Sequence, residues 1–134
     1  MTIRLQIYAA VILVLVAGLA ACGGPSTAEL AMSMSEFSFS PASATVPAGA
    51  EVTLTLTNGG TIEHNWVLLD AGYQAEAPFD ADDQANVAAE TKVATGEVQT
   101  FSFTAPSEAG SYQIVCSIPG HLEAGMAGSL TVGG

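Results

Sequence analysis

Three side chains that bind soft metal ions follow one another near the C-terminal end of the chain. Cys116, His121 and Met126 are spaced as Cys-x4-His-x4-Met within the segment Tyr112–Met126. Thiolate and thioether sulfur favour Cu(I), and imidazole binds both oxidation states, so this set suits a copper ion that cycles between Cu(I) and Cu(II). A second imidazole would complete a trigonal set of two histidines and one cysteine, with a weak axial methionine. The chain has two histidines, and we expect the other one, His64, to complete the site.

Each of these residues alone has a more ordinary explanation. A histidine before a strand that contains tryptophan is more often structural, and a cysteine at the end of a strand is usually a small buried hydrophobic residue. A methionine in a loop usually belongs to the core. The joint occurrence carries the prediction, because both histidines and the only cysteine apart from Cys22 fit one site.

Short strands are predicted on both sides of the motif. Glu51–Thr57 alternates strictly between apolar and polar residues, and Asn58-Gly59-Gly60 ends it with residues typical of turns. His64–Asp70 is predicted to be another strand, and Trp66–Leu69 within it is a continuous apolar run. A bulge near Ser35-Glu36 would bring the two halves of the first strand, with Phe37 in the second half, onto one buried face. Further strands are expected at 44–47, 98–104, 111–116 and 129–132. Short strands, frequent Gly and Pro turns and no helical repeat predict an all-β fold, a Greek-key β-sandwich or barrel.

Residues 71–96 form an insert without this alternation, and they are too many for an unstructured loop in a compact domain. Asp80 could cap a short helix from Ala81 to Lys92, with acidic residues at its positive end and Lys92 at its negative end. The insert contains five acidic residues, which are Glu76, Asp80, Asp82, Asp83 and Glu90. Such a run is usually a solvated face, and the alternative is a face that docks a partner.

The first residues are predicted to be a targeting segment. Arg4 precedes an apolar run that is too short to span a bilayer, and small residues follow it, as in a signal peptide over residues 1–21. The ending Leu-Ala-Ala-Cys22 is similar to the bacterial lipobox, in which the cysteine is lipidated and becomes the mature N-terminus. The alternatives are an uncleaved anchor and an ordinary signal with an incidental cysteine. A flexible tether at 22–30 and one domain at 31–134 are expected to follow.

The charge of the chain is strongly negative. Thirteen acidic residues against two basic ones give a formal charge of −11, and all the acidic residues follow Cys22. A domain of this charge repels nucleic acid, so nucleic-acid binding is not expected. It would be steered toward a cationic partner at a rate that falls with ionic strength, unless the charge serves solubility alone.

The ligand motif and its flanking residues resemble the cupredoxins, the type 1 blue copper proteins. The residues that carry the resemblance are Cys116-Ser-Ile-Pro-Gly-His121-x4-Met126-Ala-Gly-Ser-Leu-Thr-Val and, upstream, His64-Asn65-Trp66-Val67-Leu68. The Cys-x4-His-x4-Met spacing is most similar to that of auracyanins, and the motif is also similar to that of azurin. The resemblance implies one type 1 copper ion, with His64, Cys116 and His121 as trigonal ligands and Met126 as the axial ligand.

The resemblance also implies roles for neighbouring residues. Asn65 would hold the two ligand loops together by hydrogen bonds toward Ser117 and the Cys116 sulfur, and the backbone N–H near Ile118 would point at the same sulfur. His121 would reach the surface as the electron port. The apolar patch around it would comprise Ile62, Ile118, Pro119 and Leu122. Azurin has glycine where Glu63 stands here, so we expect a four-coordinate site without an additional carbonyl contact.

The function implied is that of an exported one-electron carrier and not of an enzyme. Lipidated at Cys22, the protein would be anchored at the outer face of the cytoplasmic membrane or in the periplasm of a bacterium. It would act as a monomer between redox complexes of a photosynthetic or respiratory chain. Implied partners are a quinol-oxidising membrane complex and a cytochrome c or oxidase, with a basic docking face.

Three other functions use the same residues. Cys116 and His121 could form a thiol nucleophile and its base, although no third orienting group is apparent. Zinc accepts cysteine and two histidines, but it usually takes a fourth N, S or O ligand in place of methionine. A copper-storage or delivery protein would expose an exchangeable site. Visible colour, reversible one-electron titration and loss of copper to a chelator distinguish these functions.

Overall fold

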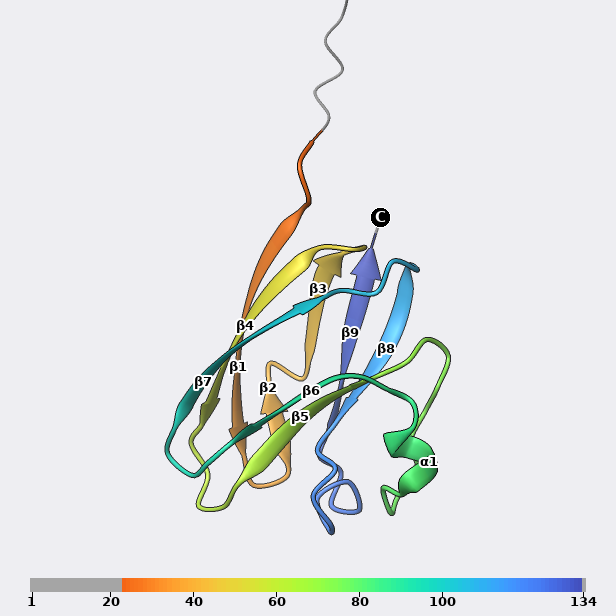
Figure 1. Cartoon of the computed structure of the whole chain (residues 1–134). Helices are drawn as coiled ribbons and strands as arrows, with labels where there is room; N and C mark the ends of the chain where they lie inside the picture. Colours follow the sequence, from red (N-terminus) through yellow and green to blue (C-terminus); the bar gives the residue numbers. More distant parts are fainter. Residues whose placement is uncertain (1–22, 134) are drawn as a thin grey trace, which may run out of the picture.

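The computed structural model describes residues 23–133, which fold into two facing β-sheets (Figure 1). One sheet has the strand order β2-β1-β4-β7, made of β2 (Ser38–Ser40), β1 (Thr27–Ser35), β4 (Glu51–Asn58) and β7 (Val98–Thr104). The other has the order β3-β9-β8-β5-β6, made of β3 (Ser43–Pro47), β9 (Ala127–Gly133), β8 (Gly110–Val115), β5 (His64–Leu69) and β6 (Val87–Val93). The one helix of the described residues, α1, is a single turn at Ala81–Gln84. The predicted all-β sandwich is confirmed.

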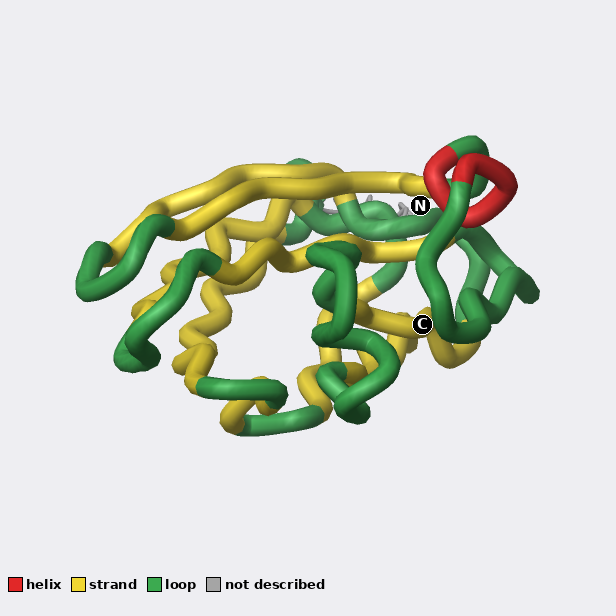
Figure 2. The backbone as a smooth tube through the Cα atoms, turned by 90° about the horizontal axis from the view of Figure 1, so that it is seen from below, coloured by secondary structure: helices red, strands yellow, loops and turns green. Residues whose placement is uncertain are grey.

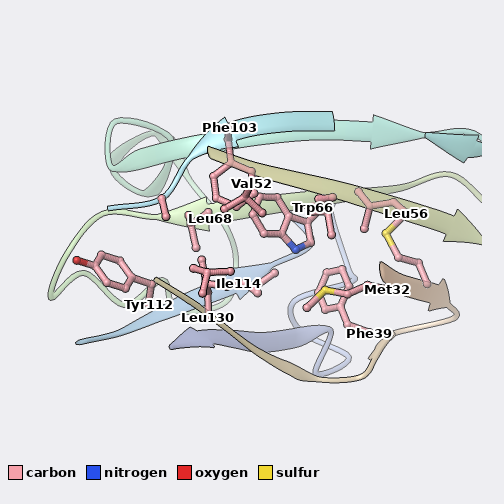
Figure 3. Close-up of a cluster of buried hydrophobic side chains, with 14 of the residues drawn as sticks. Met32, Phe39, Val52, Leu56, Trp66, Leu68, Phe103, Tyr112, Ile114 and Leu130 are labelled. Atoms are coloured by element: carbon pink, nitrogen blue, oxygen red, sulfur yellow. The ribbon is translucent and has the colours of Figure 1, made fainter. Parts of the chain in front are cut away.

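The alternating strands bury one face between the sheets. In β4 the side chains of Val52, Leu54 and Leu56 are buried, while the threonines between them point outward. Figure 3 shows Val52 and Leu56 in the same cluster of buried side chains as Trp66, whose ring lies 5.2 Å from that of Phe103, centroid to centroid. Burial of each such large apolar side chain stabilises the fold by about 1.5–3 kcal/mol. The core therefore holds the sheet that carries the first histidine in a defined position.

Strand β5 is buried on both faces over its whole length. One face joins the core between the sheets, and the other packs Val67 and Leu69 against Val115 and Ala75 in a second apolar cluster. The segment between β5 and β6 covers this outer face, with Tyr73 and Phe79 packed against the cluster. This double burial explains why the last four residues of β5, Trp66–Leu69, are apolar without alternation.

The predicted helix from Ala81 to Lys92 is wrong beyond its first turn. Asp80 does cap α1, because its side chain accepts hydrogen bonds from the backbone N–H of Asp82 and Asp83 in a capping box. After that turn the chain becomes β6, which pairs antiparallel with β5. The β-branched residues of β6 favour a strand, and β5 offers it a free edge. Lys92 therefore lies on a strand and not at a helix end.

The N-terminal part of the domain also differs from the prediction. Strand β1 begins at Thr27 and pairs in parallel with β4, so residues 27–30 belong to the sheet and not to a flexible tether. No bulge occurs near Ser35-Glu36. A tight turn joins β1 to β2 there, and Phe37 is exposed at its tip, whereas the prediction had it buried.

The expected signal peptide (1–21) and Cys22 lie outside the described residues. In residues 23–133 no helix is long and apolar enough to cross a membrane.

The loops that matter for function gather at one end of the sandwich. Because β1 and β4 run in parallel, Ser35 and Asn58 end up at the same end, and Thr27 at the opposite end. The β4–β5 loop, the β1–β2 turn and the β8–β9 loop all lie at the lower end in Figure 1, and Figure 2 views the molecule from that side. The N-terminal strand enters from the other end.

Candidate metal centre

Three potential ligand atoms meet at this lower end. They belong to His64 at the start of β5, Cys116 directly after β8 and His121 in the β8–β9 loop; all three residues are buried, and the ligand atoms lie within 4.8 Å of one another. His121 Nδ1 is 3.2 Å from both His64 Nδ1 and Cys116 Sγ. In residues 23–133, Cys116 has no disulfide partner.

The sheet register brings these residues together. Strands β5 and β8 are antiparallel, with Val67 opposite Val115, so the start of β5 lies beside the end of β8. The ladder between β8 and β9 continues past the strands, because the Cys116 N–H donates to the Met126 carbonyl at 3.1 Å. Met126 is therefore fixed beside Cys116, and its side chain is fully buried.

The β8–β9 loop folds tightly enough to return His121 to the cysteine. The His121 N–H donates to the Ile118 carbonyl at 3.0 Å, and the Met126 N–H donates to the His121 carbonyl at 3.0 Å. Gly120 and Gly125 adopt φ values of 89° and 94°, a backbone region that favours glycine. The glycines on either side of the histidine thus permit two sharp turns within one short loop.

Burial sets the protonation of these groups in the metal-free chain. It raises the pKa of the Cys116 thiol, against the opposing effect of backbone N–H groups of Asn65 and Ile118 that point at the sulfur. Burial also lowers the pKa of His64, and the nearby charge of His121 lowers it further. Both groups are therefore neutral at neutral pH, with the donor set facing inward. A metal ion that binds them would displace the thiol proton.

The donor set fits copper. Two imidazole nitrogens, one sulfur that can become a thiolate and a buried thioether are the ligands that copper takes in its electron-transfer sites. The Nε2 atom of His64 is buried without a hydrogen-bond partner, which is consistent with an imidazole held by bonds at its Nδ1 side. All four predicted ligands, His64, Cys116, His121 and Met126, are arranged as a type 1 copper site.

Asn65 joins the two ligand-bearing segments as expected. Its Nδ2 donates to Ser117 Oγ at 2.7 Å, and its Oδ1 accepts from the Ser117 N–H at 2.8 Å. Its backbone N–H donates to Cys116 Sγ at 3.4 Å. These bonds fix the cysteine and the first histidine relative to each other before any metal binds.

Asn58 is a residue that the sequence reasoning treated only as part of a turn. Its buried side chain donates to the carbonyls of Ile62 and Val93 at 2.8 and 3.0 Å, and it accepts from the Gly60 N–H at 2.9 Å. It therefore shapes the loop that leads into His64. An asparagine before two glycines is the typical sign of a turn, and nothing in that pattern indicates a buried cross-link.

The surface above the site differs from the prediction in two ways. His121 is only 6% exposed, so its imidazole lies deeper than expected. Of the predicted patch, Ile62 is 39% exposed and Pro119 is exposed, whereas Ile118 and Leu122 are half-buried and pack on the two apolar clusters. The sequence reasoning missed Phe37, whose ring contacts His121 edge-on.

A two-sheet β-sandwich with this ligand set at one end defines a type 1, or blue, copper protein. The chain belongs to the family described as copper binding proteins of the plastocyanin/azurin family, which matches residues 26–133. Blue copper proteins of this family are generally electron carriers.

Similar proteins agree with this assignment. Auracyanin-A of Chloroflexus aurantiacus is 33% identical over an alignment that covers 98% of each chain. The copper-resistant cuproprotein CopI of Rubrivivax gelatinosus is 39% identical, with 70% of this chain and 59% of that protein covered. Among solved structures, dithionite-reduced auracyanin from the photosynthetic bacterium Roseiflexus castenholzii has a TM-score of 0.67 at 29% identity, with 83% of this chain and 100% of that chain covered.

Proposed function

We propose that this protein is a membrane-tethered blue copper protein that carries one electron at a time between redox complexes of a photosynthetic or respiratory chain, and that it is not an enzyme. The observation that carries the proposal is the set of three buried ligand residues whose donor atoms lie within 4.8 Å of one another. When bound, copper supplies the one-electron Cu(I)/Cu(II) couple.

The surrounding residues suit electron transfer better than catalysis. The ligands reach the site already oriented, because Asn65 and the β-ladder fix Cys116 and its neighbours in the metal-free chain. Burial of His64, Cys116 and Met126 excludes water, so a substrate would have no open position beside the ligands. A preformed, closed site lowers the structural rearrangement that accompanies each change of charge.

The position of the N-terminus supports an orientation in which the end of the domain that holds the copper ligands points away from the membrane. The N-terminal strand enters at the end of the sandwich opposite the ligands. If Cys22 carries lipid, five residues at 22–26 precede β1, and they reach at most about 18 Å. The ligand end would then face soluble or membrane-bound partners. We propose a quinol-oxidising complex as donor and a basic cytochrome c or oxidase as acceptor, with the protein exported and acting as a monomer.

A visible spectrum of the copper-loaded protein tests the site. The protein should begin at Gly23, because β1 starts at Thr27. We expect an intense band that ascorbate bleaches and an oxidant restores, and Cys116→Ser should abolish it. A Cys116→Ser protein that stays blue, or a wild-type protein that binds zinc and remains colourless with copper, would overturn the proposal.

The other cysteine provides the matched control and tests the anchor. In the full-length chain expressed in a bacterium, Cys22→Ser should keep the blue band but lose incorporation of labelled fatty acid and move from the membrane fraction to the soluble exported fraction. If wild-type protein incorporates no fatty acid, the lipid anchor is wrong, and the copper site is unaffected by that result.

Copper handling is a second candidate function, because one relative at 39% identity is described as a copper-resistant cuproprotein. A protein that stores or delivers copper must release it, whereas the buried ligands here predict slow release. Competition with a strong Cu(I) chelator separates the two. Retention of copper over many redox cycles supports electron transfer, and rapid loss supports copper handling.

A further inference from the structure

The tip of the β1–β2 hairpin has an unusual backbone. Ser35 pairs with Ser38, so Glu36 and Phe37 form a two-residue turn, and the two serine hydroxyls are 2.9 Å apart. Phe37 has a φ of 61° and is the one non-glycine residue with positive φ in the part of the chain that the structure describes. A bulky residue in the left-handed region is a genuine outlier that its surroundings must stabilise.

Glu36 contacts the loop that leads into His64. Its Oε1 accepts a hydrogen bond from the Thr61 N–H and another from Thr61 Oγ1, the latter at 2.8 Å. These bonds lower the pKa of Glu36, so the carboxylate is ionised and the bonds are charge-assisted. Thr61 lies 25 residues from Glu36 in sequence and only three residues before His64.

The loop packs closely against both this carboxylate and the first histidine ligand. A Cβ on Gly60 would lie 2.8 Å from Glu36 Oε1 and 3.1 Å from His64 Nε2. Both groups therefore flank the same side of Gly60, and a larger residue there would displace one of them. The Glu36 carboxylate and the His64 imidazole thus pack against one short segment.

Phe37 contacts the other histidine. Its ring meets the His121 ring edge-on, with centroids 5.3 Å apart and an interplanar angle of 78°. The Phe37 side chain is 40% exposed, while His121 is 6% exposed, so the phenyl ring covers the outer side of the imidazole. The contact with His121, and not packing in the core, explains why Phe37 is both exposed and held at a positive φ.

We propose that Glu36 and Phe37 act together as a clamp that positions the two histidine ligands from outside the metal site. Glu36 fastens the loop before His64, and Phe37 covers His121, although the two histidines are 57 residues apart in sequence. The positive φ of Phe37 occurs at the turn where these two adjacent residues contact both loops. The proposal deepens the proposed function, on which it rests for the role of the histidines.

The Glu36 half is tested on the metal-free protein by amide hydrogen exchange. Glu36→Ala should speed exchange at the Thr61 amide about tenfold or more, since a charge-assisted hydrogen bond is lost. Glu36→Gln retains an acceptor oxygen and should preserve most of the protection. Glu29→Ala removes the same charge from the far end of β1 and serves as the control. Thr61 exchange that is unchanged in Glu36→Ala would overturn this half.

The Phe37 half is tested by the rate at which diethyl pyrocarbonate modifies His121 in the metal-free protein. Phe37→Ala and Phe37→Gly should raise that rate severalfold, and Phe37→Tyr should not. Phe37→Gly should also be more stable than Phe37→Ala, because glycine accepts the positive φ. The two variants should therefore differ in stability but share the faster modification of His121, which distinguishes loss of the covering ring from loss of stability. Val98→Ala, at a residue 61% exposed elsewhere on the surface, is the control.

The copper-loaded variants report on the positioning itself. Glu36→Ala and Phe37→Gly should each change the copper hyperfine splitting and the reduction potential, and Glu36→Gln and Phe37→Tyr should restore the hyperfine splitting. Signals equal to those of Glu29→Ala and Val98→Ala would overturn the clamp even if stability falls. If wild-type protein binds no copper, the proposed function fails, and the two metal-free measurements still decide whether the clamp exists.

Discussion

Gly60 lies at a point where three polar side chains converge. A Cβ there would be 2.8 Å from Glu36 Oε1, 3.1 Å from His64 Nε2 and 3.2 Å from Asn58 Oδ1. Gly60→Ala should therefore displace the loop and destabilise the protein by about 1–3 kcal/mol, the usual cost of overpacking. Denaturant unfolding of the metal-free protein measures this change.

The neighbouring glycine is the matched control for that substitution. A Cβ on Gly59 would meet only the Met34 carbonyl oxygen, at 3.8 Å, which is ordinary contact. Gly59→Ala should leave stability and the visible spectrum close to wild type. Equal stability of the two variants would mean that the loop gives way freely and that close packing around His64 is unimportant.

The buried ligands make the stability of the metal-free protein depend on pH in two windows. The pKa of His64 is lowered from 6.5, so the unfolded chain takes up its proton first and stability falls as pH drops below 6.5. The pKa of Cys116 is raised from 9.0, so the unfolded chain loses its proton first and stability falls as pH rises above 9.0. Denaturant midpoints measured across this range should trace both declines.

Two substitutions distinguish the contributions of His64 and Cys116 to the pH dependence of stability. His64→Asn should weaken the acid decline and leave the alkaline one, while Cys116→Ala should do the reverse. A metal-free protein whose midpoint is flat on both sides would contradict the inference that these groups are held neutral by burial.

At the scale of elements, the side chain of Asn65 joins the start of β5 to the segment after β8. Asn65→Ala removes both of its side-chain hydrogen bonds to Ser117 and leaves the Ser117 N–H without that acceptor. We expect a loss of stability of about 1–3 kcal/mol and a shifted blue band, because the cysteine and His64 lose a shared restraint. Unfolding and the visible spectrum are the two measurements.

Gln113 provides the control, because its side chain makes a similar cross-link from β8. Its Oε1 accepts from the Ala75 N–H at 2.7 Å, so it contacts the segment after β5 and none of the four ligands. Gln113→Ala should lose stability without shifting the blue band. A band that shifts equally in both variants would show that general loosening, and not the Asn65 bridge, controls the site.

For the molecule as a whole, acidic residues far outnumber basic ones. Lys92 is the only Lys or Arg after Cys22, and its Nζ lies 3.7 Å from Glu63 Oε1 in an exposed pair that contributes little to stability. Of the five acidic residues in the insert, Asp83 is buried and accepts a hydrogen bond from the Tyr73 hydroxyl, so it serves the fold. The other four are exposed, although the Asp80 side chain also caps α1.

Electron transfer to a basic cytochrome c should therefore slow as ionic strength rises. Salt screens interactions between exposed charges that are more than about 10 Å apart at 0.1 M ionic strength. Screening therefore lowers the rate of electrostatically steered association. Stopped-flow rates over a salt series measure the slope, with an acidic cytochrome as the control, for which salt should raise the rate. A rate with the basic partner that ignores salt would reject acidic steering.

The ligand set and the positions of most strands around it were predictable from the sequence. Cys116, His121 and Met126 stand close together in one loop, so their spacing is itself a local structural constraint. Strict alternation in β4 and the apolar run in β5 also report burial directly, since side chains of a strand point to alternate faces. These features depend on neighbours in sequence.

Only the tertiary structure decided what depends on residues distant in sequence. Strand β6 replaced most of the predicted helix because β5 offered it an edge, and local propensity cannot indicate that edge. Phe37 contacts the His121 ring, and Glu36 accepts hydrogen bonds from the loop before His64; these are two adjacent residues that a sequence pattern interprets as part of a strand. Such contacts join segments that only the packing of the two sheets brings to the same end of the molecule.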